Sequence, residues 1–384
     1  MTWNIHPSQQ AVRDEVKAFC EKHDVIKKGE ELDRAPEPQQ FPFEYFKVIS
    51  DAGFPRYSYP TELGGEGKTN LEYNTMIEEF ARHDPATSLL IAIQQLAGQP
   101  IIKFGNDYLK EKYLKPAAAG DILMAFMLTE PEAGSDASNQ KTTATPDGDD
   151  YIINGEKIFI MHGDVADAGT LFCKIQEEGI SERVSTIVMD LKDVEGVTRR
   201  TLERKMGMKC ATTGYLKFEN VRVPQKNLLG DKGKGFRYAM ITLDGARIGV
   251  AAQCLGIAQR ALDEAIAYAK KRIAFGAPIA KLQAIQWMIA DMGTRVEAAR
   301  ALVYKASVLA DAGEKFSMEA AQAKLYAAET AGFCVDRAMQ IHGGYGYIEE
   351  FSPIGKLYRD QRVTEIYEGT SEIQRLVIAT GLLR

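Results

Sequence analysis

One carboxylate in this sequence stands where it could do acid–base chemistry. Residues 366–372 (IYEGTSE) place Glu368 beside a glycine and among apolar neighbours, just before a predicted helix. Apolar surroundings disfavour the charged form of a carboxyl group and raise its pKa, and a carboxylate that titrates near neutrality can serve as a general base. The alternative interpretation is an ordinary acidic residue at a helix N-terminus, where negative charge is favourable.

Three other segments combine residues that suit a bound ligand. Residues 128–136 (LTEPEAGSD) offer glycine and small hydroxyl side chains for close backbone approach, or they form only a turn between domains. Residues 272–276 (RIAFG) offer a cation and an aromatic face, which suit a pyrophosphate and an adenine, or they are a plain helix C-cap. Residues 340–346 (QIHGGYG) leave bare backbone on which a planar group could rest, or they are a loop.

Composition narrows the class of protein. The 384 residues are 45% apolar and 26% charged, with a net charge of −6, which is typical of a globular protein and argues against duplex nucleic acid as a partner. No apolar run reaches the roughly 18 residues of a membrane span, and the start does not resemble a signal peptide. We therefore expect a cytoplasmic protein, or one of the mitochondrial matrix, without membrane insertion.

Sequence motifs of several common chemistries are absent. There is no Walker loop, no G-x-S-x-G elbow and no complete G-x-G-x-x-G fingerprint. The five cysteines are widely spread and show no C-x-x-C or paired histidine spacing. We therefore expect reduced thiols and no metal site.

The pattern of residue types along the chain predicts three domains. Apolar residues recur at three- and four-residue steps over residues 1–125, which is typical of helices. Short β-branched and aromatic runs over residues 126–232 indicate strands. Residues 233–384 are rich in alanine and again show helical periodicity.

Three local elements can be predicted within these domains. Asn154-Gly155 lies between two strand-like runs and predicts a two-residue hairpin, because both residues tolerate positive φ. Alternating steps of three and four predict one long amphipathic helix over residues 282–303. Thr370 and Ser371 are candidate caps of a last helix.

Together and in this order, these segments resemble the acyl-CoA dehydrogenase family, in texture its short- and branched-chain members. The resemblance covers essentially the whole chain. It is carried by residues 128–136 (LTEPEAGSD), 221–230 (VRVPQKNLLG), 272–276 (RIAFG), 282–292, 340–347 (QIHGGYGY), 358–360 (YRD) and 366–379 (IYEGTSEIQRLVIA).

The resemblance implies an α+β multidomain fold with an N-terminal α-helical domain, a middle β-domain of barrel or sandwich type and a C-terminal four-helix bundle. It implies a homotetramer with FAD at subunit contacts. The implied reaction removes a proton from Cα and a hydride from Cβ of an acyl-CoA thioester and passes the electrons to an electron-transferring flavoprotein. Glu368 matches the base, and its backbone N–H together with a flavin ribityl hydroxyl would polarise the thioester oxygen.

The same match implies two sets of binding residues. Those implied for the CoA thioester are Ser135, Asp244, Arg247 and Gly369. Those implied for FAD, partly from a neighbouring subunit, are Phe126, Leu128, Thr129, Ser135, Phe159, Met161, Arg272, Phe275, Gln283, Gln340, Gly343, Gly344, Thr370 and Glu372.

The sequence departs from the family at one place beside the flavin. The family commonly has Trp-Ile-Thr-Asn where this chain has Phe159-Ile160-Met161-His162. Phe159 can cover the ring, but Met161 cannot donate the hydrogen bond that the usual threonine offers near flavin N5. Either a backbone N–H replaces that bond, or the flavin is tuned to an acyl group whose product is conjugated or cyclic.

Two interpretations of the activity stay open beside dehydrogenation. A flavin-dependent enoyl-CoA reductase would use the same Glu368 in reverse, and a CoA-binding scaffold would have lost its flavin. Polar residues at 57–59 and 94–95 stand where an aliphatic acyl pocket would need apolar ones. They favour a cyclic or aryl acyl group if they line the pocket, and carry no information if they face solvent or a subunit contact.

Overall fold

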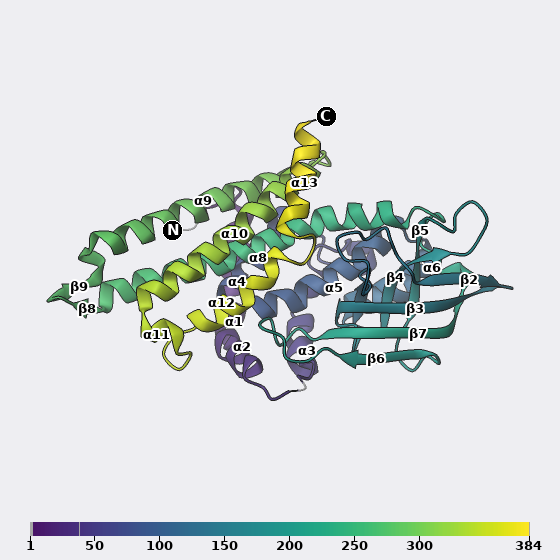
Figure 1. Ribbon diagram of the computed structural model, residues 1–384, viewed down its shortest axis with the longest axis horizontal. Helices are drawn as coiled ribbons and strands as arrows, with labels where there is room; N and C mark the ends of the chain where they lie inside the picture. The colour runs from purple at the N-terminus through teal and green to yellow at the C-terminus, as the bar shows by residue number, and fades with distance from the viewer. Residues whose placement is uncertain (1–2, 38, 384) are drawn as a thin grey trace.

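The computed structural model describes residues 3–37 and 39–383, with helices at both ends of the chain and a sheet between them (Figure 1). Two of the first helices begin with caps. Thr69 and Glu72 form a reciprocal capping box, and Asp84 caps the helix that starts at Pro85. The α-helices that precede the sheet are α1 (Ser8–Lys22), α2 (Val25–Asp33), α3 (Phe43–Asp51), α4 (Asn70–His83), α5 (Pro85–Phe104), α6 (Asp107–Leu109) and α7 (Lys115–Ala119).

The middle of the chain forms one curled sheet of seven strands at one end of the molecule, to the right in Figure 1. The strand order is β1-β4-β2-β3-β7-β6, and β5 also pairs with β4. β4 runs parallel to β1 and β2, and the other pairs are antiparallel. The strands are β1 (Met124–Met127), β2 (Thr143–Asp147), β3 (Asp150–Met161), β4 (Ala168–Ile175), β5 (Val184–Asp190), β6 (Val197–Thr201) and β7 (Thr213–Pro224).

The predicted hairpin at Asn154-Gly155 is wrong. Both residues lie inside β3, and the turn that precedes this strand is at Gly148, with φ of 61°. Gly155 is required because a Cβ there would lie 2.6 Å from Thr142 Oγ1, and the pairing of β3 with β7 shifts its register at this point. A bulge and a tight turn both favour glycine, so the sequence pattern does not distinguish them.

The last part of the chain is helical again. α8, α9 and α10 pack against one another, and α13 packs on α10. The predicted amphipathic helix over 282–303 is confirmed within α9, and the predicted cap Thr370 accepts a hydrogen bond from the N–H of Ile373. The elements are α8 (Gly235–Lys271), β8 (Ile273–Ala274), β9 (Ala277–Pro278), α9 (Gln283–Asp311), α10 (Ser317–His342), α11 (Gly344–Tyr347), α12 (Ile354–Gln361) and α13 (Ser371–Leu382).

α8 is the central helix and contacts α4, α5, α9 and α10. It is long and apolar enough to cross a membrane, but 72% of its most apolar window is buried inside the protein, as expected for a core helix. The cysteines confirm the predicted thiols: all five are free and buried.

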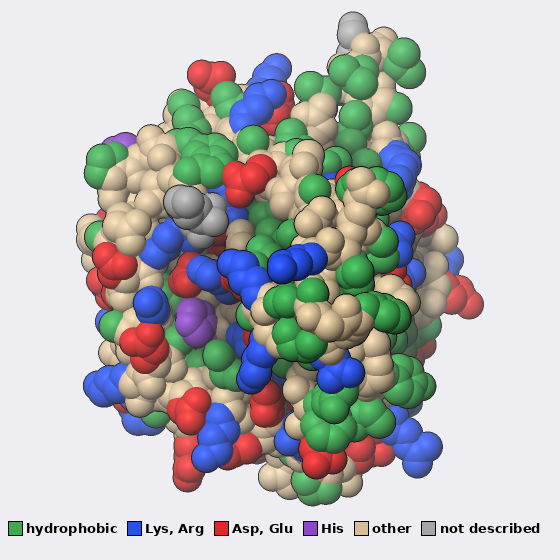
Figure 2. Space-filling view, turned by 90° about the vertical axis from the view of Figure 1, so that its left-hand side faces the viewer, with side chains coloured by type: hydrophobic (Ala, Val, Ile, Leu, Met, Phe, Trp, Pro, Cys, Tyr) green, Lys and Arg blue, Asp and Glu red, His purple; other side chains and the backbone are tan. Residues whose placement is uncertain are grey.

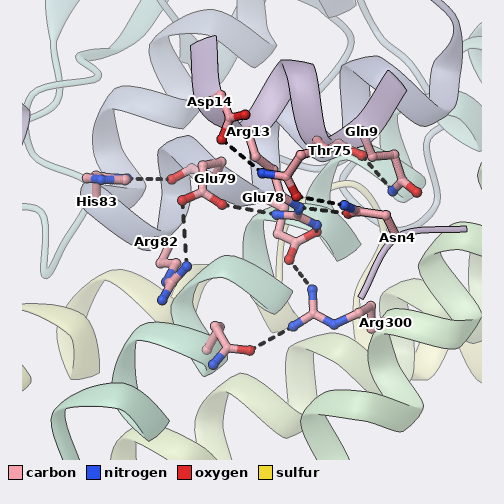
Figure 3. Close-up of polar contacts among 12 residues, drawn as sticks. Asn4, Gln9, Arg13, Asp14, Thr75, Glu78, Glu79, Arg82, His83 and Arg300 are labelled. Carbon is pink, nitrogen blue, oxygen red and sulfur yellow. Dashed lines mark hydrogen bonds and ion pairs between the residues drawn. The ribbon is translucent and has the colours of Figure 1, made fainter. Parts of the chain in front are cut away.

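A buried group of charges ties the N-terminal helices to the C-terminal ones (Figure 3). Glu78 of α4 lies between Arg13 of α1, at 2.9 Å, and Arg300 of α9. The hydroxyl of Tyr304 donates a further hydrogen bond to Glu78 at 2.9 Å. Burial alone would raise the pKa of Glu78, but the two arginines outweigh it and hold the pKa below its usual range. The carboxylate is therefore the charge around which three helices meet.

We predict that Glu78→Gln lowers the free energy of unfolding by about 3–5 kcal/mol, because it leaves two buried cations without a counter-charge. Urea unfolding followed by circular dichroism measures this as a lower midpoint. The loss is complete above pH 4.5 and fades as the pH falls through the lowered pKa of Glu78, since the protonated residue has also lost its charge. The control Asp51→Asn breaks the exposed pair with Lys47 and should cost less than about 1 kcal/mol. Equal losses would contradict the prediction.

Candidate active site

A cavity of about 300 Å³ lies between α5 and α8, and Glu368 forms part of its wall. The space exists because α8 presents small residues to it. Gly245, Ala246 and Gly249 line the cavity, and a Cβ built on Gly245 would meet no atom within 4 Å. The side formed by α5 is mostly apolar. Its lining residues are Leu89, Ala92, Ile93, Gln95, Leu96, Gln99, Ile102 and Lys103.

The loop before α13 holds Glu368 in an unusual backbone conformation. Glu368 has φ of 55° and Gly369 has φ of 89°, a region that is costly for residues other than glycine. Side chains fix the carbonyls of both residues. The Glu368 carbonyl accepts from Arg247 Nε at 3.5 Å and from Gln374 Nε2 at 3.2 Å. The Gly369 carbonyl accepts from Lys324 Nζ and from Gln374, both at 2.8 Å.

The carboxyl group of Glu368 on the cavity wall has a strongly raised pKa. Burial raises its pKa to about 7, although Arg247 and Lys324 act in the opposite direction. Its Oε2 has no hydrogen-bond partner among the residues that the structure describes. The helix-charge interpretation does not hold, because α13 begins at Ser371 and its first-turn acid is Glu372. At neutral pH the group is close to half ionised, as a general base requires.

Arg247 belongs to the same cluster and is itself fixed. It is 4% exposed, and its Nη1 lies 2.7 Å from Asp244 Oδ1. Asp244 also accepts a hydrogen bond from the hydroxyl of Ser317. The structure therefore brings Asp244, Arg247 and Gly369, three of the four predicted substrate residues, together with Glu368.

A buried lysine that the sequence analysis missed anchors the segment after β1. Lys157 of β3 is fully buried, and its Nζ donates to the Leu128 carbonyl at 3.0 Å, to Glu130 at 2.8 Å and to Gln140 at 3.1 Å. Burial lowers the pKa of Lys157 to about 8. The only signal in the sequence was a lysine at a strand position next to apolar residues, which is not specific enough to predict this contact.

The residues predicted to face the flavin ring gather at this edge of the sheet. Phe159 is 66% exposed and has φ of 58°. The sulfur of Met161 accepts a hydrogen bond from the hydroxyl of Thr213 on β7 at 3.3 Å. A hydroxyl group is therefore present beside position 161 although the residue there lacks one. The other predicted residues of this region are Phe126, Leu128, Thr129 and the exposed Ser135.

The predicted cofactor residues of segments 272–283 and 340–344 lie at the opposite end of the molecule, around the β8–β9 hairpin at the left of Figure 1. The guanidinium of Arg272 lies 5.6 Å from the centre of the Tyr345 ring, and Phe275 is 94% exposed. A second cavity of about 560 Å³ lies here, and its lining includes Gly343 and Gly344, where a Cβ would meet no atom within 4 Å. Figure 2 faces this end and shows Lys and Arg side chains beside hydrophobic ones.

The two groups of predicted cofactor residues lie far apart within one chain. Arg272 follows Arg247 by about 25 residues along α8, which corresponds to about 38 Å at 1.5 Å per residue. On the Glu368 side lie Asp244, Gly369, Thr370 and Glu372, and on the Arg272 side lie Phe275, Gln283, Gln340, Gly343 and Gly344.

Comparison with known protein families agrees with the resemblance seen in the sequence. Residues 6–121, 125–221 and 233–383 match the N-terminal, middle and C-terminal domains of acyl-CoA dehydrogenase. The chain belongs to the acyl-CoA dehydrogenase family. The predicted fold class, the enzyme class acting on CH–CH bonds of acyl-CoA and the cofactor FAD are thereby confirmed.

Several relatives are similar over their full length. The 3-(aryl)acrylate reductase of Clostridium sporogenes is 45% identical, over 95% of this chain and 100% of its own. The caffeyl-CoA reductase–Etf complex subunit CarC of Acetobacterium woodii is 43% identical, over 97% of each chain. The structure of butyryl-CoA dehydrogenase from Megasphaera elsdenii matches with a TM-score of 0.93 and 39% identity over 100% of both chains. The family thus includes enzymes named for either direction of the reaction.

We predict that Glu368→Gln stabilises the protein above neutral pH. The pKa of Glu368 is raised from 4.5 to about 7 in the folded state, so ionisation costs stability that an amide does not. The cost is absent below pH 4.5, grows as the pH rises to about 7 and is then constant, at up to about 3 kcal/mol. Thermal unfolding at pH 5 and pH 8, with FAD content matched, measures the gain. A variant that melts with the wild type at pH 8 would show that Glu368 is not destabilised by burial.

Proposed function

We propose that this chain removes two hydrogens from an acyl-CoA thioester to give the trans-2-enoyl-CoA, with Glu368 as the general base. The observation that carries the proposal is a carboxyl group with a pKa of about 7 on the wall of a largely apolar cavity. The α-proton moves to the Glu368 carboxylate. FAD, when bound, supplies the two-electron acceptor for the hydride that leaves Cβ.

The backbone around Glu368 supports a second role for this residue. The α-proton of a thioester becomes acidic enough to remove only if its carbonyl oxygen accepts hydrogen bonds. We assign one of these hydrogen bonds to the backbone N–H of Glu368. Arg247, Lys324 and Gln374 bind the carbonyl oxygens of Glu368 and Gly369 and so fix the backbone of the loop in its positive-φ conformation. Asp244 and Arg247 then orient the loop and the thioester, while Ser135 and Gly369 contact the pantetheine arm.

The residues of the chain fit FAD if two chains share it. Within one chain Arg272 lies about 38 Å from Arg247 along α8, so Arg272 and Phe275 would hold the pyrophosphate and adenine of a flavin whose ring lies against the sheet of another chain. Large apolar side chains are exposed around this end, as expected of a surface that another subunit covers. We therefore propose a homotetramer. The exposed side chains include Leu282, Trp287, Tyr347, Ile348 and Phe351.

The direction of the reaction has two candidates. The aryl- and caffeyl-CoA reductases among the relatives favour reduction of an enoyl-CoA as the second candidate, and microscopic reversibility assigns Glu368 the same proton in that direction. The relative named as part of an Etf complex supports an electron-transferring flavoprotein as the redox partner of this chain. The cytoplasmic location also stays a prediction.

We expect Glu368→Gln to retain FAD and acyl-CoA binding but to lose flavin reduction by a factor of at least 10²–10⁴, because an amide cannot accept the α-proton. Anaerobic bleaching of the flavin by a panel of straight, branched, alicyclic and aryl acyl-CoA thioesters measures it. Near wild-type bleaching by the variant would place the base on another residue.

We expect Arg272→Ala to yield protein with little or no yellow colour and a lower melting temperature, because bound cofactor stabilises the folded state. Arg272→Lys should recover only part of the FAD, since an ammonium group cannot make the bidentate contact. The control is Lys271→Ala, the adjacent exposed cation. Full occupancy of FAD in Arg272→Ala would leave this residue as a helix cap.

A further inference from the structure

Two of the polar side chains in the cavity wall pair with each other. Ser58 and Gln95 both line it, and Gln95 Nε2 donates a hydrogen bond to Ser58 Oγ. The other polar residues of these stretches have structural tasks instead. Tyr59 donates to the Gln94 carbonyl at 2.6 Å, and Gln94 Oε1 accepts from the N–H of Met124 at 3.0 Å. Of the predicted polar stretches, this pair is therefore the part that meets the cavity.

The amide of Gln95 has one group left over. The side chain is 5% exposed, and its Oε1 has no hydrogen-bond partner among the residues that the structure describes. A buried carbonyl oxygen without a donor is unfavourable, because it has lost its hydrogen bonds to water. The terminal torsion of a glutamine side chain is soft, so the amide can turn toward a ligand. An occupant that supplies a donor would remove this cost, whereas an aliphatic occupant would keep it.

The pair lies on a different wall from Glu368. Gln95 belongs to α5 and Ser58 to the loop beside it, while Glu368 belongs to the loop that packs on α8. The two walls are joined at one end, where Gln253 of α8 donates to Ser88 of α5 at 2.8 Å and accepts from Tyr367, the neighbour of Glu368. Gln95 stands about two helical turns along α5 from Ser88. An acyl group whose Cα reaches Glu368 can thus extend toward the pair.

The unpaired Oε1 of Gln95 determines which kind of substituent on an acyl group could bind here. It is an acceptor, so it binds a hydrogen-bond donor such as a hydroxyl and disfavours a carboxylate. Two lysines also line the cavity: the Lys68 ammonium lies 5.7 Å from the centre of the Tyr57 ring, and burial lowers the pKa of Lys103, although the charge of Asp244 acts in the opposite direction.

From this geometry we infer that the acyl group carries a hydroxyl substituent beyond Cβ, which the Ser58–Gln95 pair binds. The inference rests on the proposed function, because it takes Glu368 as the point that fixes Cα. The apolar lining on both sides of the pair, which includes Leu89, Ile93 and Leu96, suits an apolar or aryl body between the thioester and the hydroxyl.

The test compares matched thioesters on the FAD-loaded enzyme. Phenylpropanoyl-CoA is set against para-hydroxyphenylpropanoyl-CoA, and hexanoyl-CoA against ω-hydroxyhexanoyl-CoA, so that the aryl and alkyl sources of the hydroxyl are separated. We expect the hydroxylated member of at least one pair to have a kcat/KM about tenfold higher. Gln95→Met should abolish this preference mainly by weakening the hydroxylated substrate. Dissociation constants in the Glu368→Gln background report binding without turnover and should show the same ratio.

The control is Gln99→Met, the same substitution one turn further along α5, at a half-buried residue that lines the same cavity. It should leave the hydroxyl preference as in the wild type. Equal use of both members of each pair, a preference that survives Gln95→Met, or a stronger preference for glutaryl-CoA would overturn the inference while leaving the dehydrogenase intact. Absence of flavin reduction by every thioester, hydroxylated or not, would instead refute the proposed function.

Discussion

The chemistry of this site depends on keeping one carboxyl group buried without a direct ion pair. The carboxyl groups of Glu78 and Glu368 each have two cations nearby, and their pKa values are shifted in opposite directions. At Glu78 the arginines bind the carboxylate itself and lower its pKa. At Glu368 the cations Arg247 and Lys324 bind the backbone carbonyls of the loop instead. Their charge fixes the loop without neutralising the carboxylate, so desolvation prevails and the pKa of Glu368 is raised.

The second constraint is the length of α8. Its middle supplies the small residues that open the cavity and the arginine that holds the Glu368 loop, and its end carries Arg272. These positions are far apart along a rigid helix, and this separation is the basis for proposing that another copy of the chain completes the site. The exposed apolar surface around the β8–β9 hairpin has the same explanation. Cofactor binding and assembly are in this view one event, and a substitution at the tip of α8 acts on both.

Patterns in the amino-acid sequence predicted the order of helices and strands along the chain, because the spacing of apolar residues reflects which face of an element is buried. They were sufficient for the long helix at 282–303 and for the cap at Thr370. They misplaced the turn at Asn154-Gly155, since the steric demand on Gly155 comes from Thr142, which lies beside the Thr143–Asn154 pair of β2 and β3 and is apparent only once the strands are paired. The domain boundaries at 125 and 232 stay predictions. The contacts of Lys157 depend on the folded segment after β1, which no periodicity describes.

At position 161, where this chain departs from the family, the pairing of two strands places a hydroxyl group beside the methionine. Met161 pairs with Thr213 across β3 and β7, and the threonine hydroxyl donates to the methionine sulfur at 3.3 Å. A thioether is a weak acceptor, so this bond is easily exchanged for a better one. A hydroxyl donor therefore lies one strand away from the position that usually carries it. In the proposed mechanism Glu368 has the same role in both directions, so the direction of the reaction would depend on the flavin and on the polar groups beside it.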